Sequence, residues 1–291
     1  MTATAIVSIS DALTRLTVAP AIGGSLVAWT RLSDGLDLLR PSPADADAEG
    51  PRQLACYPLA PWSNRIANGG FDNPQGWLAL SPNSSNDPLP IHGSAWQQAW
   101  QVVAHDASSL LLQLDSQVPF AYRAEQRISL EQGRLKIELK VTHLADQPSW
   151  HGLGLHPYFP RTGATRLQAN AEQVWLCDDG RLPTALSELP TEWNFRQSAQ
   201  LPSELVDNGF TGWDGRAVIT QEDAGYQLEL AVTGSEFFLL FCPLDKPFFC
   251  IEPVSHPVNA HHLPGRPGLR LLEKGQSCEL ALSLTYTALK P

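Results

Sequence analysis

Short runs of alternating apolar and polar residues recur along this chain and constrain its fold more than any other feature. The clearest run is 135–141, LKIELKV, in which every second residue is apolar and the others are charged. Because a strand points successive side chains to opposite faces, the pattern predicts a strand with one buried and one solvated face. The run 126–130 precedes it across the turn-like segment 131–134, so the two are predicted to pair as an antiparallel hairpin.

Further strands are predicted throughout the chain. Alternation recurs at 226–230 and 280–284, and the continuous apolar run 237–242 suits a strand covered on both faces. No segment carries a long apolar stripe at helical spacing, and 24 prolines and 21 glycines interrupt the chain at short intervals. Antiparallel signals without a strand–helix–strand rhythm predict an all-β chain folded as a large antiparallel β-sandwich.

The chain shows no internal repeat, linker or break in composition, so residues 1–291 are expected to form a single domain. The acidic, small-residue stretch 42–50 is predicted to be a surface loop. A net charge of -10 argues against a nucleic-acid partner. The first twenty residues lack a secretory pattern, and no run is long enough to span a bilayer, so a cytoplasmic protein without membrane partners is expected.

The cysteines and three histidines near the C-terminus give no metal pattern. The five cysteines are odd in number, widely scattered and without a CxxC pair, so buried reduced thiols are expected. His256, His261 and His262 have no carboxylate or thiolate at a recognisable ligand spacing, so a solvated loop is predicted for them. These residues therefore predict no metal site.

Two residues stand in surroundings that suit proton transfer. Glu252 ends the apolar run 248–251, on the face it shares with Phe248 and Cys250, and a carboxylate there must reach solvent or have a partner. His156 stands directly before a proline among apolar and aromatic residues, and its pKa lies near neutrality. His151 is five positions earlier, on the opposite face of a regular strand, which argues against a metal shared with His156.

Three more polar residues are candidates, each with an ordinary alternative. Arg65 carries a fork of donors suited to sugar hydroxyls, although this segment alone favours a structural surface arginine. His92 lies between a proline-containing segment and Gly93, and taken alone such a histidine is more often structural than catalytic. Asp207 begins an Asp-Asn-Gly sequence that is typical of a turn.

Taken in order, these segments resemble the aldose 1-epimerase (galactose mutarotase) family. The matching segments are Gly23-Gly24 with Trp29, Asn64-Arg65-Ile66, His92-Gly93, His156-Pro157-Tyr158-Phe159, 207–215 (DNGFTGWDG), and Cys250-Ile251-Glu252-Pro253. The resemblance implies a β-supersandwich with its site in a cleft on one broad sheet. It also implies that Glu252 is the base and His156 the acid that open and close the ring of a free aldohexose. Arg65, His92 and Asp207 are implied to position the sugar, and the resemblance implies that neither a metal nor an organic cofactor is required.

The resemblance leaves the hexose and two rival functions open. Pro160-Arg161 follows the HPYF sequence where better-known galactose mutarotases usually carry Asn-Leu, so galactose is not assured. A hexose-6-phosphate 1-epimerase would use the same acid and base, but it needs arginine or lysine side chains at the site to bind the phosphate, and the motifs supply only Arg65. A non-catalytic carbohydrate-binding sandwich would use the same aromatic and acidic residues only to hold sugar, and a glycosidase using Glu252 with Asp207 is a more remote alternative.

Overall fold

The computed structural model describes residues 6–42 and 50–289, and strands make up nearly all of its regular structure. The all-β antiparallel sandwich predicted from the alternating runs is confirmed. Most of the loop predicted at 42–50 lies outside the described residues, which resume at Gly50. In the described chain, helical structure consists of three-residue 3₁₀ turns: η1 (Pro51–Gln53), η2 (Ala67–Gly69), η3 (Ala95–Gln97), η4 (Thr191–Trp193) and η5 (Ala260–His262).

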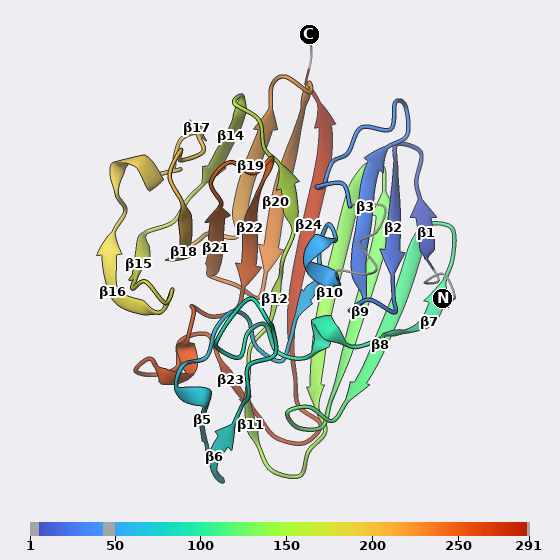
Figure 1. Cartoon of the computed structure of the whole chain (residues 1–291). Coiled ribbons are helices and arrows are strands. Elements are labelled where there is room, and N and C mark those ends of the chain that lie inside the picture. The colour runs from blue at the N-terminus through green and yellow to red at the C-terminus, as the bar shows by residue number, and fades with distance from the viewer. Residues whose placement is uncertain (1–5, 43–49, 290–291) are drawn as a thin grey trace.

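Two large antiparallel sheets form the body of the molecule (Figure 1). In order across the first, the nine strands are β17 (Ala199–Gln200), β14 (Thr165–Ala169), β19 (Arg216–Gln221), β20 (Tyr226–Thr233), β24 (Ser277–Ala288), β10 (Arg134–His143), β9 (Tyr122–Glu131), β8 (Ser109–Ser116) and β7 (Gln101–His105). The second consists of β16 (Pro183–Glu188), β15 (Gln173–Cys177), β18 (Val206–Thr211), β21 (Phe237–Cys242), β22 (Phe248–Val254), β12 (Gly154–Leu155) and β4 (Pro58–Leu59), with β13 (Tyr158–Pro160) also paired to β22.

Three smaller sheets complete the fold. The N-terminal sheet lies over β8, β9 and β10 in Figure 1 and contains β1 (Val7–Ser10), β2 (Thr14–Ala19) and β3 (Ser25–Arg31). The two others are hairpin-sized: β5 (Gly70–Asn73) with β6 (Gly76–Ala79), and β11 (Ser149–His151) with β23 (Arg270–Leu272).

The predicted hairpin is β9 and β10, with Glu131 opposite Arg134. Its two turn residues, Gln132 and Gly133, both have positive φ (49° and 75°). Two such residues form the tight turn whose twist matches that of antiparallel strands. The predicted strands at 226–230, 237–242 and 280–284 are confirmed as parts of β20, β21 and β24.

One apolar cluster fills the space between the layers. It joins Ile137 of β10 and Leu282 of β24 to Phe249 and Ile251 of β22, and Trp29 of the N-terminal sheet belongs to it as well. Burying a side chain of this size contributes about 1.5–3 kcal/mol each, so this cluster fixes which face of each strand turns inward. The outer face of β22 is therefore free to carry other chemistry.

The cysteine prediction is correct in part. All five thiols are free, and Cys56, Cys242 and Cys250 are buried, whereas Cys177 and Cys278 are half-buried. Burial raises the pKa of the Cys242 thiol to about 12 and that of Cys278 likewise to about 12, so both are protonated at neutral pH.

Candidate active site

Glu252 lies on the outer face of β22, as the alternation of this strand predicts. Its neighbours two and four residues earlier, Cys250 and Phe248, pack in a second apolar cluster, whereas Phe249 and Ile251 face the main core. Only 1% of Glu252 is exposed, so the carboxyl does not reach solvent at the strand end.

No hydrogen bond from the described residues reaches either carboxyl oxygen of Glu252. Burial raises the pKa of Glu252 well above its usual value, and the nearby Asp207 raises it further. Arg65 and Arg52 act in the opposite direction. Ionising a carboxyl group that is this poorly solvated costs free energy. Carboxyl groups with such perturbed pKa values are found more often at functional sites than in ordinary cores.

His156 lies between β12 and β13, which both pair with β22, and this connection brings it to Glu252. Its Nε2 is 3.3 Å from Oε1 of Glu252. The ring stacks on Tyr158, with centroids 4.6 Å apart, and lies 4.7 Å from the ring of Tyr57. Burial lowers the pKa of His156 well below its usual value, as do the charges of Arg52 and Arg40.

His92 is held with a defined tautomer beside His156. The backbone N–H of Asn64 donates to its Nδ1 at 3.1 Å, which leaves the proton of the neutral ring on Nε2. The two imidazole rings meet edge to face with centroids 5.5 Å apart. His92 has a φ of 62°, and the following Gly93 a φ of 66°. A Cβ on Gly93 would lie 2.0 Å from the carbonyl oxygen of Ala60, so this segment needs glycine there.

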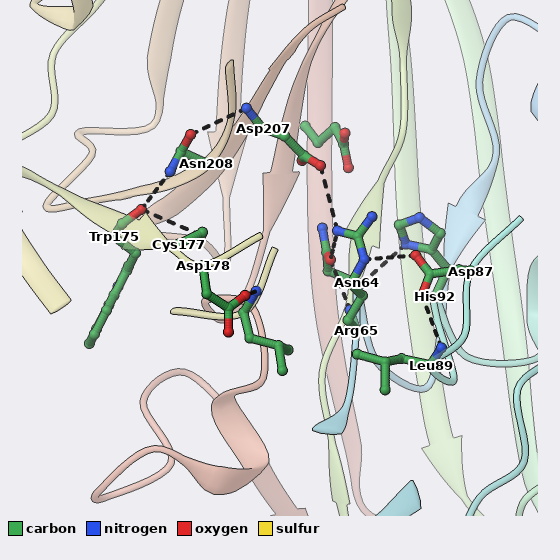
Figure 2. Close-up of polar contacts among 12 residues, drawn as sticks. Asn64, Arg65, Asp87, Leu89, His92, Trp175, Cys177, Asp178, Asp207 and Asn208 are labelled. Atoms are coloured by element: carbon green, nitrogen blue, oxygen red, sulfur yellow. Dashed lines mark hydrogen bonds and ion pairs between the residues drawn. The ribbon is translucent and has the colours of Figure 1, made fainter. Parts of the chain in front are cut away.

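Arg65, in the loop after β4, contacts two carboxylates: Asp87 in the segment between β6 and η3, and Asp207 in β18 (Figure 2). Its Nε donates to Oδ2 of Asp87 at 2.7 Å, and its Nη1 lies 3.6 Å from Oδ2 of Asp207. Burial raises the pKa of Asp207, while the charge of Arg65 opposes this. Asp207 is in strand β18 and not in a turn, because Phe241 of β21 pairs with it.

The prediction of a solvated loop around three histidines is wrong for two of them. His256 is 1% exposed and His261 3%, because this segment packs beneath the loop that carries Arg65. Nε2 of His256 accepts the backbone N–H of Ser63 at 3.0 Å, and its Nδ1 donates to the Pro257 carbonyl. The His256 side chain therefore helps to hold the loop that carries Arg65 in place.

The structure thus brings all five predicted residues into one site, on the outer face of the eight-stranded sheet. Sequence reasoning missed Asp87, Tyr57 and Arg52. Asp87 precedes a proline and has the pattern of a turn residue, and Tyr57 and Arg52 lie in no recognisable motif. The donor atoms of His156, Cys250 and Glu252 lie within 4.8 Å of one another, the arrangement in the described chain best suited to a metal ion.

Comparison with known proteins shows the family to which the chain belongs. The model of the family described as aldose 1-epimerase matches residues 6–285. The chain belongs to the aldose 1-epimerase family. It is 35% identical over 272 residues to the uncharacterized protein YphB of Escherichia coli K12, covering 90% of this chain and 92% of YphB. It is 24% identical over 246 residues to the uncharacterized protein YihR of the same organism, covering 78% and 77% of the two chains.

Solved structures of other proteins share the fold over nearly the whole chain. A candidate aldose 1-epimerase from Escherichia coli K12 superposes with a TM-score of 0.91 and 33% identity, covering 98% of this chain and 99% of that one. Galactose 1-epimerase from Lactobacillus acidophilus NCFM has a TM-score of 0.80 at 16% identity, with 98% and 95% covered. The latter likeness concerns the fold alone. Within the described residues, no helix is long and apolar enough to cross a membrane.

Proposed function

We propose that this chain is a mutarotase that interconverts the α and β anomers of a free aldohexose by acid/base ring opening and closure. The observation that carries the proposal is the buried pair formed by His156 and Glu252, whose reactive atoms lie 3.3 Å apart. The family match supports the proposal, since aldose 1-epimerase is the reaction for which the family is described.

The reaction needs one base and one acid. Glu252 as carboxylate removes the proton from the anomeric hydroxyl, and the bond between C1 and the ring oxygen breaks with its electrons going to that oxygen. His156 gives a proton to the ring oxygen, which leaves an open-chain aldehyde. Rotation about the C1–C2 bond presents the other face of the aldehyde, and the two groups then act in reverse to close the ring.

The pair needs a total of one proton for this cycle. Because burial favours the neutral form of each group, the free enzyme holds that proton mainly on Glu252. The reactive tautomer has the same proton count, with a carboxylate and an imidazolium. The charges of that tautomer attract each other across 3.3 Å in surroundings with little water, which offsets part of the cost of forming them.

Three residues are proposed to position the sugar. Arg65 and Nε2–H of His92 offer donors, and Asp207 offers an acceptor that is 11% exposed. Arg65 is itself fixed by Asp87, so its remaining donors have a defined direction. Holding the hydroxyls of the sugar keeps the anomeric carbon aligned with the acid and base through opening and closure.

Polarimetry on freshly dissolved α-D-glucose, α-D-galactose and a panel of other aldoses tests the proposal. Acceleration of the optical-rotation change over buffer for at least one free sugar is expected. The panel includes galactose because a protein with the same fold is named galactose 1-epimerase. It includes other aldoses because Pro160-Arg161 departs from the sequence usual in galactose mutarotases. A rate equal to that in buffer for every sugar would reject mutarotation. Tight binding by NMR without anomer exchange would instead select a carbohydrate-binding module.

One observation favours a hexose-6-phosphate 1-epimerase as a second candidate. Nε and Nη2 of Arg52 are buried without a hydrogen-bond partner among the described residues. The guanidinium lies 5.4 Å from the centre of the Trp96 ring. Burial lowers the pKa of both His92 and His156, and the charge of Arg52 lowers it further. Unused donors of a guanidinium suit a phosphate. Faster anomer exchange of hexose 6-phosphates than of free hexoses would make this the better assignment.

A further inference from the structure

Three side chains on and beside β22 combine ligand types that thiophilic metals prefer. Cys250 and Glu252 are two residues apart on the same face of the strand, and His156 approaches from the connection between β12 and β13. One donor atom from each lies within 4.8 Å of the others, and all three residues are buried. Both oxygens of Glu252 lack a hydrogen-bond partner in the described chain, so the carboxylate is free to bind a cation.

We propose that His156, Cys250 and Glu252 form a binding site for one thiophilic divalent cation, with Zn²⁺ as the probe that fits best. Three protein ligands with one open position are the arrangement typical of reactive zinc sites. Zinc bonds of about 2.0–2.1 Å to nitrogen and oxygen in a tetrahedron place these two ligand atoms about 3.3 Å apart. The Nε2 to Oε1 distance is 3.3 Å, so this pair needs no rearrangement.

The sulfur of Cys250, the third ligand, lies within 4.8 Å of the other two donor atoms, so a small shift of its side chain is enough to bring it to the metal. The Cys250 thiol and the Glu252 carboxyl each lose a proton to solvent as their bonds to the metal form, and nothing is oxidised or reduced. The resulting site holds a dication against one thiolate and one carboxylate, so its net charge is zero. A soft thiolate and an imidazole favour Zn²⁺ over Mg²⁺ or Ca²⁺.

Charges around the site act in both directions. The positive charges of Arg65 and Arg52 act on Glu252 and repel a cation bound there. The negative charge of Asp207 also acts on Glu252 and attracts such a cation. Arg65 is already paired with Asp87 at 2.7 Å and lies 3.6 Å from Asp207, which offsets its charge. The cation would occupy the same imidazole and carboxylate that ring opening needs. Zn²⁺ should therefore inhibit mutarotation in competition with sugar, a consequence that rests on the proposed function, whereas metal binding does not.

The binding test uses Co²⁺ as a spectroscopic probe and Zn²⁺ in competition with a chromophoric chelator, on the full-length protein. One equivalent of Co²⁺ is expected to produce the intense near-ultraviolet absorption of a metal bound to thiolate, and Zn²⁺ should abolish it. Cys250→Ser is expected to lose this band and to weaken Zn²⁺ binding at least about tenfold. Cys250→Ala serves in its place if the serine variant does not fold.

Cys242→Ser is the matched control, because Cys242 is also buried, lies on the neighbouring strand β21 and is outside the group of three. It should bind Zn²⁺ as the wild type does. An unchanged affinity in Cys250→Ser and Cys250→Ala, an equal loss in Cys242→Ser, or no thiolate band with Co²⁺ would each overturn the proposal.

The activity arm compares inhibition by Zn²⁺ in wild type and Cys250→Ser. Wild-type activity should fall with Zn²⁺ and return with a chelator, while the variant should stay active and respond at least about tenfold less. If no sugar is turned over at all, the proposed function fails while the Co²⁺ spectrum still decides the metal site. Inhibition equal in the two proteins would contradict the proposed link between this site and activity.

Discussion

Nε2 of His156 lies 3.3 Å from Oε1 of Glu252, and the two side chains are only 8% and 1% exposed. The contact joins segments far apart in the chain, because Gly154 of β12 pairs with Val254 of β22. Both groups are shielded from solvent, so the protonation of each depends strongly on the protonation of the other. This coupling is the basis of the first two predictions.

Replacing Glu252 by glutamine should abolish mutarotation without unfolding the chain. The base is lost, and general-base catalysis contributes about 10²–10⁴-fold, so kcat measured by polarimetry should fall by about that factor. Burial raises the pKa of Glu252 in the folded protein above that in the unfolded chain, so the wild type loses stability as pH rises through the raised pKa and the carboxyl ionises. The Tm advantage of Glu252→Gln over wild type should thus grow with pH in thermal unfolding. An active Glu252→Gln enzyme would remove the assigned base.

The pH dependence of kcat/KM should be bell-shaped, with loss of activity when the pair holds two protons or none. Burial lowers the pKa of His156, so the acid limb should lie below the usual histidine value of about 6.5. Burial raises the pKa of Glu252, so the alkaline limb should lie well above the usual glutamate value of about 4.3. Initial rates corrected for spontaneous mutarotation measure both limbs. An acid limb centred above neutrality would contradict the assignment.

Replacing Arg65 by lysine should raise KM more than it lowers kcat. Lysine cannot keep the hydrogen bond to Asp87 while it offers a second donor to sugar. A hydrogen bond to a charged group is worth about 1.5–3 kcal/mol, which corresponds to about 10–150-fold in kcat/KM. Arg123→Lys is the control, since Arg123 pairs with Asp115 at 2.7 Å where the two side chains are 43% and 47% exposed. That change should leave kcat/KM and Tm unaltered.

His92→Asn should fold normally yet bind sugar more weakly. Asparagine tolerates the positive φ of this position, and its side-chain oxygen provides an acceptor for the backbone N–H of Asn64. The donor Nε2–H is lost, so KM should rise about 5–30-fold. Circular dichroism and thermal unfolding check the fold, and polarimetry gives KM. An unchanged KM would show that His92 has only a structural role.

Gly93→Ala should destabilise the protein and reduce activity through the position of His92. A left-handed φ costs an L-residue about 1–2 kcal/mol, and overlap with Ala60 adds to this. Gly35→Ala is matched, because Gly35 has a φ of 76° but nothing within 4 Å of the added Cβ. Denaturant unfolding should show a clearly larger loss for Gly93→Ala. Equal losses would mean that the segment of His92 yields to the added methyl group.

The fold was readable from local sequence where packing and local pattern agree. In 135–141 and 248–252, alternation alone separated the inward from the outward side chains, and the structure confirms both. The pattern failed where a polar residue has its partner elsewhere in the chain. Asp207 has the sequence of a turn residue but lies in β18. His256 and His261 are predicted to be exposed to solvent in a loop but are buried.

The sequence by itself determined the strands, the faces they bury and the order of the chemically useful segments, because side-chain alternation is a local property. Only the tertiary structure decided that His156 meets Glu252, that Asp87 fixes Arg65, and that Cys250 joins a group of possible metal ligands. These contacts depend on which strands pair across long stretches of chain. The pKa shifts of His156 and Glu252 have the same origin, since burial is their first cause and arises from the packed fold.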